Sequence, residues 1–363
     1  MAMQKNVLVI FTWWTIAWNV AKSKVSQNTK SDPNNFMSIL ENSIDIIKLN
    51  WNIEIHASVE SVFNIDSSDM KPENWTILIE KIQEKYDDFD AFIILHGTNT
   101  MWYSSSALSF ALENINKPVI FTWAQVPLGY LWTDSVTNLV NALRIAVWWY
   151  NEVKWVMAVF WSKIITWTRV KKWTDFDYDP FNAFQTWALW QIGRFIRFND
   201  SILKKHVAYL SKYKPLAIQS RVLSIKKDFD VKHIASITEF PWMNENIFKS
   251  LVENNWIKAF IFRAFWAWDP SSHLFPAFEY LKENKIPIVV TTQAPSWVAS
   301  FQVNENWQYL KENDLAIPAH DMSMESMITK LWWLLAQNLS YEQIKNKMLE
   351  DLHGEINIEN ELI

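Results

Sequence analysis

Short apolar runs alternate with amphipathic stretches along most of this chain. Continuously apolar, β-branched runs are typical of strands buried on both faces of a parallel sheet, and they lie at 7–11, 91–95, 119–121 and 156–160, with a further strand-like run at 53–59. Apolar residues at helical spacing lie between these runs, at 36–47, 72–86, up to residue 114 and at 135–147. For the helix at 72–86 we expect Asp69 as the N-cap. Alternating strands and helices indicate parallel βαβ units, so the pattern predicts a doubly wound, mostly parallel α/β sheet.

The pattern weakens near residues 199–214, where lysines cluster, and then resumes in a second, shorter series. This series predicts strands at 233–237, 259–262 and 287–292, and helices at 245–252, 274–283, 325–337 and 341–351. A chain of 363 residues is long enough for two domains. We predict a larger N-terminal domain at 1–200, a linker at 201–228 and a smaller C-terminal α/β domain at 229–363.

Composition changes how the loops are interpreted. The chain has 24 Trp and 4 Gly, whereas average usage would give about 25 glycines at this length. Several tryptophans stand in turns that favour glycine, as in Trp13-Trp14, Trp242 and Trp256. We infer that most of them are glycines encoded by UGA and misread as tryptophan. Trp75 and one of Trp332 and Trp333 are expected to be genuine. The alternative is a Trp-rich binding surface, which UGG codons at 13, 14, 123 and 132 would favour.

Charge and residue types exclude several functions. A net charge of −5 spread along the chain argues against nucleic acid or anionic membranes as partners. The chain has no cysteine, and its seven histidines show no metal-ligand spacing. No phosphate loop, signal peptide or membrane span is recognisable, even with glycines restored. We expect a cytoplasmic protein with no cofactor and no metal.

Three polar loops follow predicted strands, at 12–15, 66–69 and 96–100, and a basic stretch lies at 169–172. Loops at the carboxyl ends of parallel strands can converge on one crevice. The residue types suggest a Thr or Ser nucleophile, hydroxyls and amides that hold a small polar ligand, and an activating lysine. Taken one by one, threonines at strand ends are more often turn formers than nucleophiles, and lysines are usually solvated.

With tryptophan read as glycine, residues 7–18 become VLVIFTGGTIAG, while residues 93–100 read IILHGTNT as printed. Together with NIDSSDM at 64–70 and DMSMESMITKL at 321–331, these motifs resemble the type I, cytoplasmic L-asparaginases. The resemblance runs from about Asn6 to Glu355. It implies hydrolysis of L-asparagine to aspartate and ammonia, with no cofactor, by a homodimer or homotetramer.

The resemblance also implies roles for individual residues. Thr15 matches the family's nucleophile, which forms a β-aspartyl ester. Its activating cluster matches Thr98, Asn99 and Lys172. The substrate carboxylate is then held at Asp66, Ser67 and Ser68, and main-chain amides near Trp14 and at Trp123-Ala124 form the oxyanion site.

Two positions depart from the family. Asn99 stands where the family has an aspartate that pairs with the substrate ammonium, which removes a charge worth about 1.5–3 kcal/mol. Asp269 stands where the family often has an asparagine that reaches into a neighbouring subunit's site, and its carboxylate is a candidate replacement for the missing charge. His96 is expected to be structural.

Two further functions stay open on the sequence. The ammonia-generating subunit of a tRNA-dependent amidotransferase shares these motifs, although it usually carries an extra N-terminal domain. The second open function is that of a catalytically weakened relative that binds or regulates, because Asn99 stands in place of the family's aspartate.

Overall fold

The computed structural model describes residues 3–12, 33–126, 132–148, 155–186, 188, 190–199, 204, 223–266, 269–294 and 305–357. The chain divides into two compact units, Met1–Lys227 and Asp228–Ile363. Each unit is a layered α/β structure with its own sheet, which agrees with the predicted fold class.

In the described part of unit 1, eight strands form one sheet in the order β10-β9-β6-β5-β4-β3-β1-β2. The first five strands along the chain are parallel. They are β1 (Met3–Phe11), β2 (Ile53–Ser61), β3 (Ala91–Leu95), β4 (Val119–Thr122) and β5 (Val156–Phe160). Strands β3, β4 and β5 are buried along their whole length, as continuous apolar runs in a covered parallel sheet should be.

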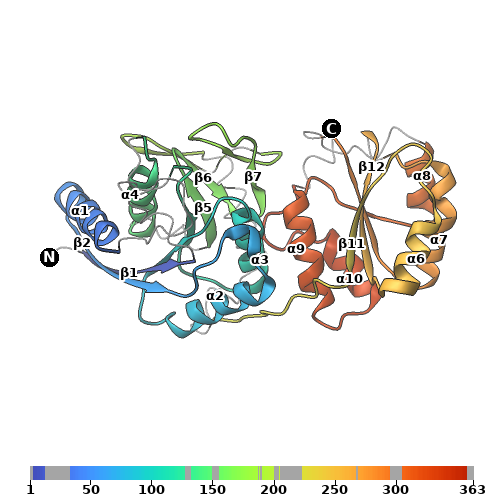
Figure 1. Cartoon of the computed structure of the whole chain (residues 1–363), viewed down its shortest axis with the longest axis horizontal. Helices are drawn as coiled ribbons and strands as arrows, with labels where there is room; N and C mark the ends of the chain where they lie inside the picture. The colour runs from blue at the N-terminus through green and yellow to red at the C-terminus, as the bar shows by residue number, and fades with distance from the viewer. Residues whose placement is uncertain are drawn as a thin grey trace, which may run out of the picture. The chain divides into compact units, whose positions relative to one another are not determined.

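The helices of unit 1 cover both faces of this sheet (Figure 1). They are α1 (Pro33–Trp51), α2 (Pro72–Glu84), α3 (Met101–Ala111) and α4 (Ser135–Ala146). Helices α1 and α4 pack together on one face, and α2 and α3 pack together on the other. Because β1–α1–β2 and β4–α4–β5 step in opposite directions across the same face, their crossovers have opposite hands. The α2 and α3 crossovers step the same way as the α4 crossover but lie on the opposite face, so they share the hand of the α1 crossover, and the α4 crossover is the exception to the usual right-handed rule.

The antiparallel extension of the sheet was not predicted from the sequence. It consists of β6 (Lys163–Thr166), β9 (Trp190–Ile192) and β10 (Ile196–Phe198), while β7 (Val170–Lys172) pairs with β8 (Phe181–Ala183) separately. These strands have only three or four residues, too few to show a period.

Some predicted boundaries were wrong. Helix α3 ends at Ala111 rather than near residue 114. The N-cap position of α2 is Lys71, not Asp69, which lies in a short 3₁₀ turn upstream.

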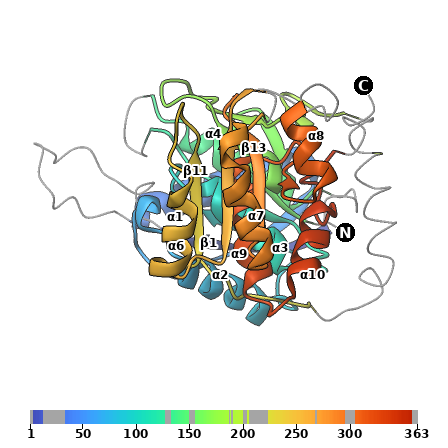
Figure 2. The ribbon, with the colours of Figure 1, turned by 90° about the vertical axis from the view of Figure 1, so that its right-hand side faces the viewer.

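In the described part of unit 2, four parallel strands form one sheet in the order β11-β12-β13-β14. The strands are β11 (Ile234–Thr238), β12 (Ala259–Ala264), β13 (Ile288–Thr292) and β14 (Ile317–Pro318). Figure 2 shows α6 (Asn246–Asn255) and α7 (Phe275–Glu283) in front of this sheet. Helices α9 (Met324–Leu335) and α10 (Tyr341–Leu349) pack together, and α8 (Glu305–Glu312) lies between β13 and β14 in the chain.

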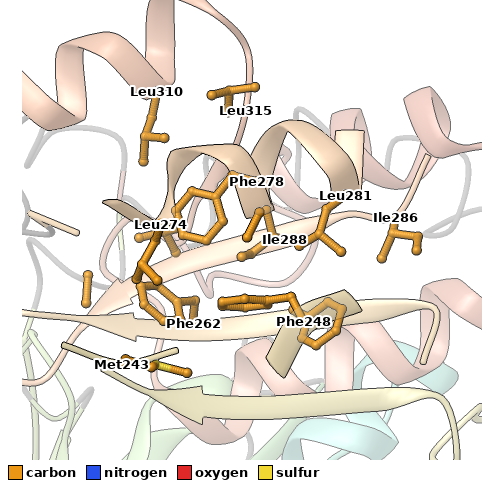
Figure 3. Close-up of a cluster of buried hydrophobic side chains, with 14 of the residues drawn as sticks. Met243, Phe248, Phe262, Leu274, Phe278, Leu281, Ile286, Ile288, Leu310 and Leu315 are labelled. Carbon is orange, nitrogen blue, oxygen red and sulfur yellow. The ribbon is translucent and has the colours of Figure 1, made fainter. Parts of the chain in front are cut away.

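The core of unit 2 is a cluster of aromatic and aliphatic side chains between α6, α7 and β12 (Figure 3). Phe248 is fully buried, and its ring centroid lies 5.3 Å from that of Phe260 and 5.7 Å from that of Phe278. Such edge-to-face pairs add to the free energy gained by burial of the rings.

Residues 223–227 belong to unit 1, since Ser224 and Lys226 hydrogen-bond to the end of α3 and Lys227 pairs with Glu80 of α2. Most of the predicted linker at 201–228 lies outside the described residues, so the predicted domain bounds stay predictions.

Several tryptophans have backbone conformations that favour glycine. Trp161, Trp242 and Trp256 have φ angles of 47°, 61° and 57°, in the left-handed region. Trp256 is the left-handed C-cap of α6, the position where helices most often place glycine.

Candidate active site at the carboxyl edge of the unit 1 sheet

The strand order 2-1-3-4-5 reverses direction between β1 and β3, which makes this pair the topological switch point of the sheet. Thr12 follows β1 there, and its N–H and hydroxyl both donate to Leu95 O, at 3.2 and 3.0 Å. Its own carbonyl accepts from Ile65 N at 3.1 Å. The hydrogen bonds of Thr12 thus connect the end of β1 to the end of β3 and to the loop that follows β2.

The loop after β2 forms a tight polar turn. Ser67–Asp69 is a 3₁₀ helix capped by Asp66, whose carboxylate accepts from Ser68 N at 2.8 Å. Short polar residues favour such turns because their oxygens satisfy nearby backbone N–H groups. Ser67 is buried and Ser68 is exposed, so the turn presents one hydroxyl inward and one to solvent.

The loop after β3 contacts this turn directly. Asn99 N donates to Ser67 Oγ at 3.2 Å, and Asn99 Nδ2 donates to Ser68 Oγ at 2.8 Å. Thr100 Oγ1 donates to Ser67 O at 2.6 Å. The two predicted polar loops, about 30 residues apart in the chain, therefore form one surface.

Lys172 reaches the same surface from β7. Its Nζ lies 3.5 Å from Thr98 Oγ1, at the outer limit of hydrogen-bond distance. The lysine side chain is only 11% exposed, and it also pairs with the carboxylate of Asp175. Sequence reasoning did not identify Asp175, although its i, i+3 spacing from Lys172 was visible.

The segment after β4 is fixed by a buried carboxylate. Asp134 accepts from Gln125 N at 3.0 Å and from Val126 N at 2.9 Å, while Asn138 Nδ2 donates to Trp123 O at 2.7 Å. Burial raises the pKa of Asp134, and its backbone hydrogen bonds partly oppose this. Ala124, the predicted oxyanion residue, lies buried in the middle of this held segment.

His96 begins the β3 loop but has no access to solvent. Burial lowers its pKa to about 4, against a smaller opposing effect from its hydrogen bond to Gly97. Both ring nitrogens contact protein groups, which fits the structural role that we predicted.

Three further predicted positions are described separately. Thr15 and Trp14 lie outside the described residues. Asp269 belongs to unit 2, where burial raises its pKa and Asn306 partly offsets the rise. Its Oδ1 is buried and has no hydrogen-bond partner among the described residues.

The described part of the site thus offers hydroxyls, amides and one amine around a switch point. Within the described ranges no cluster of three histidines or carboxylates is suited to a metal ion. No described helix is long and apolar enough to span a bilayer. These features define an α/β protein whose polar loops meet at the topological switch point of a mostly parallel sheet, the place where such folds bind small ligands.

The comparisons agree with this class. Residues 6–204 match the family described as "Asparaginase, N-terminal", and residues 233–348 match the "Glutaminase/Asparaginase C-terminal domain". The chain belongs to the asparaginase family.

Three similar proteins illustrate the range of that family. L-asparaginase 1 of Escherichia coli (strain K12) is 33% identical over 299 residues, 80% of this chain and 82% of that protein. The crystal structure of L-asparaginase I from Vibrio cholerae superposes with a TM-score of 0.76 at 26% identity, over 98% of this chain and all of that one. A glutamyl-tRNA(Gln) amidotransferase subunit of Thermococcus kodakarensis is 27% identical over 303 residues, 81% of this chain and 65% of that protein.

Proposed function

We propose that this protein is an L-asparagine amidohydrolase that uses Thr15 as its nucleophile. The observation that carries the proposal is the contact of Thr98 with Lys172, on the surface where the Ser67 turn meets the Asn99 loop. A threonine hydroxyl needs a partner that removes its proton, and a lysine that contacts a second hydroxyl can supply one. The likeness to L-asparaginase 1 of E. coli supports the choice of substrate.

In the first step the Thr15 oxygen attacks the side-chain amide carbon of asparagine. The C–N bond then breaks, the nitrogen leaves as ammonia with a proton, and a β-aspartyl ester remains on Thr15. We assign the turn Asp66–Ser68 to the α-carboxylate of the substrate, since backbone N–H groups and hydroxyls suit an anion.

In the second step water attacks the ester carbon and releases aspartate. Thr98 and Lys172 orient and deprotonate this water, and the main-chain amides near Ala124 stabilise the oxyanion in both steps. Asp134 and Asn138 fit this role, because they hold the segment 123–126 in place before substrate binds.

The test is ammonia release from L-asparagine, with L-glutamine as a comparison substrate. The full chain should be produced with glycine wherever its gene has UGA. We expect Thr15→Ala, Thr98→Ala and Lys172→Met each to lower kcat by about 100-fold or more. Lys171→Met, a neighbouring lysine that lies over the Phe184 ring, is the matched control and should keep its activity. An active Thr15→Ala variant would overturn the proposal.

The similarity to the amidotransferase protein of T. kodakarensis favours a second candidate, an ammonia-generating subunit for tRNA-dependent amidation. This candidate predicts ammonia release that requires a partner protein, whereas the main proposal predicts release by the chain alone. The third candidate is a non-catalytic relative of the family. It is kept because position 99 has an amide that donates to Ser68, where the family has a charged carboxylate.

The resemblance also implies that the protein forms a homodimer or homotetramer and that it is located in the cytoplasm. Both stay predictions. In such an assembly we assign Asp269 to the substrate ammonium of a neighbouring subunit. Its buried, unpaired Oδ1 within the described structure is what supports this assignment.

A further inference from the structure

A buried chain of hydrogen bonds lies directly behind the Thr98 loop. Trp75 Nε1 of α2 donates to Ser104 Oγ of α3 at 2.8 Å, and Ser104 Oγ lies 2.7 Å from His96 Nε2. On its other side His96 Nδ1 lies 2.8 Å from Gly97 O. All three side chains are buried, at 4% exposure for Trp75 and none for Ser104 and His96.

The carbonyl at one end of this series of hydrogen bonds sets the direction of the others. Gly97 O can only accept, so His96 Nδ1 carries a proton and donates to it. Burial lowers the pKa of His96 to about 4, so the ring is neutral at pH 7 and its Nε2 accepts from the Ser104 hydroxyl. The indole N–H of Trp75 only donates, and Ser104 Oγ accepts it on a lone pair.

We propose that Trp75, Ser104 and His96 are positioning residues that fix the backbone at Gly97 and thereby the place of Thr98. Gly97 immediately precedes Thr98, and as a glycine it has no side chain of its own that could fix the backbone at this position. The His96 ring supplies the missing restraint from the buried side of the loop.

The hydrogen bonds from Trp75 through Ser104 and His96 to Gly97 also link the two loops of the site. Helix α2 begins just after the Ser67 turn, and His96 begins the loop that bonds to that turn through Asn99 and Thr100. Any shift of Gly97 thus moves Thr98 relative to both Ser67 and Lys172. This inference rests on the proposed function for the role of Thr98, but the hydrogen-bond pattern stands without it.

The first test is kinetic and uses the full chain. Ser104→Ala removes the central hydroxyl, and we expect kcat for asparagine to fall about ten-fold or more while KM changes by less than about three-fold, because misplacing a catalytic group lowers rate rather than binding. Ser109→Ala is the matched control. It removes another buried hydroxyl of α3, whose hydrogen bond within the described structure goes to Ser105 O on its own helix, so kcat should not change.

Two further variants separate positioning from general loss of structure. Trp75→Phe leaves the Ser104 proton free to point to His96, so its kcat should fall less than that of Ser104→Ala. His96→Asn retains an N–H that can donate to Gly97 O and should keep more kcat than His96→Leu. Equal kcat for Ser104→Ala and Ser109→Ala would overturn the proposal, as would equal losses for His96→Asn and His96→Leu.

A third test does not depend on activity. In ¹⁵N-histidine NMR spectra, with His96→Asn used for assignment, we expect His96 as the neutral Nδ1–H tautomer at pH 7. The Nε2–H tautomer would overturn the proposal even if Ser104→Ala failed to fold. If the tautomer is as expected but the wild-type chain releases no ammonia from asparagine, the proposed function fails and the hydrogen-bond chain stands.

The gene offers a final check. Since the indole N–H of Trp75 is used, codon 75 should be UGG, and a UGA codon there would contradict the assignment.

Discussion

At the scale of single residues, Asn99 is the departure with the largest expected effect. Its amide donates to Ser68 Oγ, whereas a carboxylate at this place would accept from Ser68 and face the substrate ammonium with a charge. We expect Asn99→Asp to raise kcat/KM for asparagine by roughly 10- to 150-fold, the equivalent of about 1.5–3 kcal/mol. Asn99→Ala serves as the control and should show no gain. An unchanged kcat/KM in Asn99→Asp would mean that charge at position 99 does not matter here.

A second prediction concerns the relation of Asp269 to Asn99. If Asp269 supplies the charge that Asn99 lacks, Asp269→Ala should be costly in the wild-type chain and much less so in Asn99→Asp. A double-mutant cycle on kcat/KM measures this coupling directly. Additive effects of the two substitutions would show that the two positions act independently.

His96 predicts how stability depends on pH. Its pKa is lowered from 6.5 to about 4 in the folded state because burial disfavours the charged ring. The unfolded chain therefore binds this proton more readily, so the stabilising contribution is complete above about pH 6.5 and is lost as pH falls toward 4. The loss amounts to about 3 kcal/mol.

Urea unfolding of wild type and His96→Asn at pH 7.5, 6 and 5 measures this contribution. The difference in free energy of unfolding between the two proteins should shrink as the solution becomes more acidic. Parallel pH dependences would show that His96 is not the titrating group.

At the scale of elements, helix α4 organises the loop that follows β4. The N-cap position of α4 is Asp134, whose two carboxylate oxygens each accept a backbone N–H of that loop. Asp134→Asn turns one of these acceptors into a donor and leaves a buried N–H unsatisfied, at a cost of about 1–3 kcal/mol. We expect lower kcat as well, because Ala124 loses its fixed place.

Tyr86→Phe is a matched control for this prediction. It also removes an acceptor from a backbone N–H, that of Asn116, but in the connection that leads into the amino end of β4. Similar destabilisation with unchanged kcat is expected for it. If both variants lost kcat equally, the effect of Asp134→Asn would be one of stability alone.

The parallel strands could be predicted because each is a short apolar run between turn residues. Strand β5 (Val156–Phe160) has the predicted bounds, and β3 agrees as well. Strands β6 to β10 could not be predicted, since each has three or four residues and their pairing is decided by contacts distant in the chain. Asp69 failed as a helix cap because Asp66 closes a separate 3₁₀ turn before α2 begins.

The candidate site was predictable only in part, for the same reason. The turn at Asp66–Ser68 and the loop at 96–100 each follow a recognisable strand, and parallel pairing brings such loops to one edge. Their mutual hydrogen bonds required the folded chain. The approach of Lys172 to Thr98, 74 residues away, depends on β7, an element with no sequence signal.

At the scale of the whole molecule, the excess of tryptophan and the shortage of glycine can be tested on the protein itself. Trp256 is 75% exposed at a left-handed helix end, so its side chain gains little from burial and its backbone is strained. Trp256→Gly should therefore stabilise the chain by about 1–2 kcal/mol, the cost of the left-handed conformation for a residue with a side chain.

Trp75 predicts the opposite. Its indole is buried and donates to Ser104, so Trp75→Gly should cost about 3–5 kcal/mol or more, through the lost packing and the broken hydrogen-bond chain. Free energies of unfolding of the two variants, measured against the chain with tryptophan at both positions, decide between the readings of the composition. If Trp256→Gly destabilises the chain, tryptophan is the native residue at that helix end. If Trp256→Gly stabilises the chain while Trp75→Gly unfolds it, the native residue is glycine at position 256 and tryptophan at position 75. The burial and hydrogen bonding of each position then indicate which tryptophans of the printed sequence are genuine.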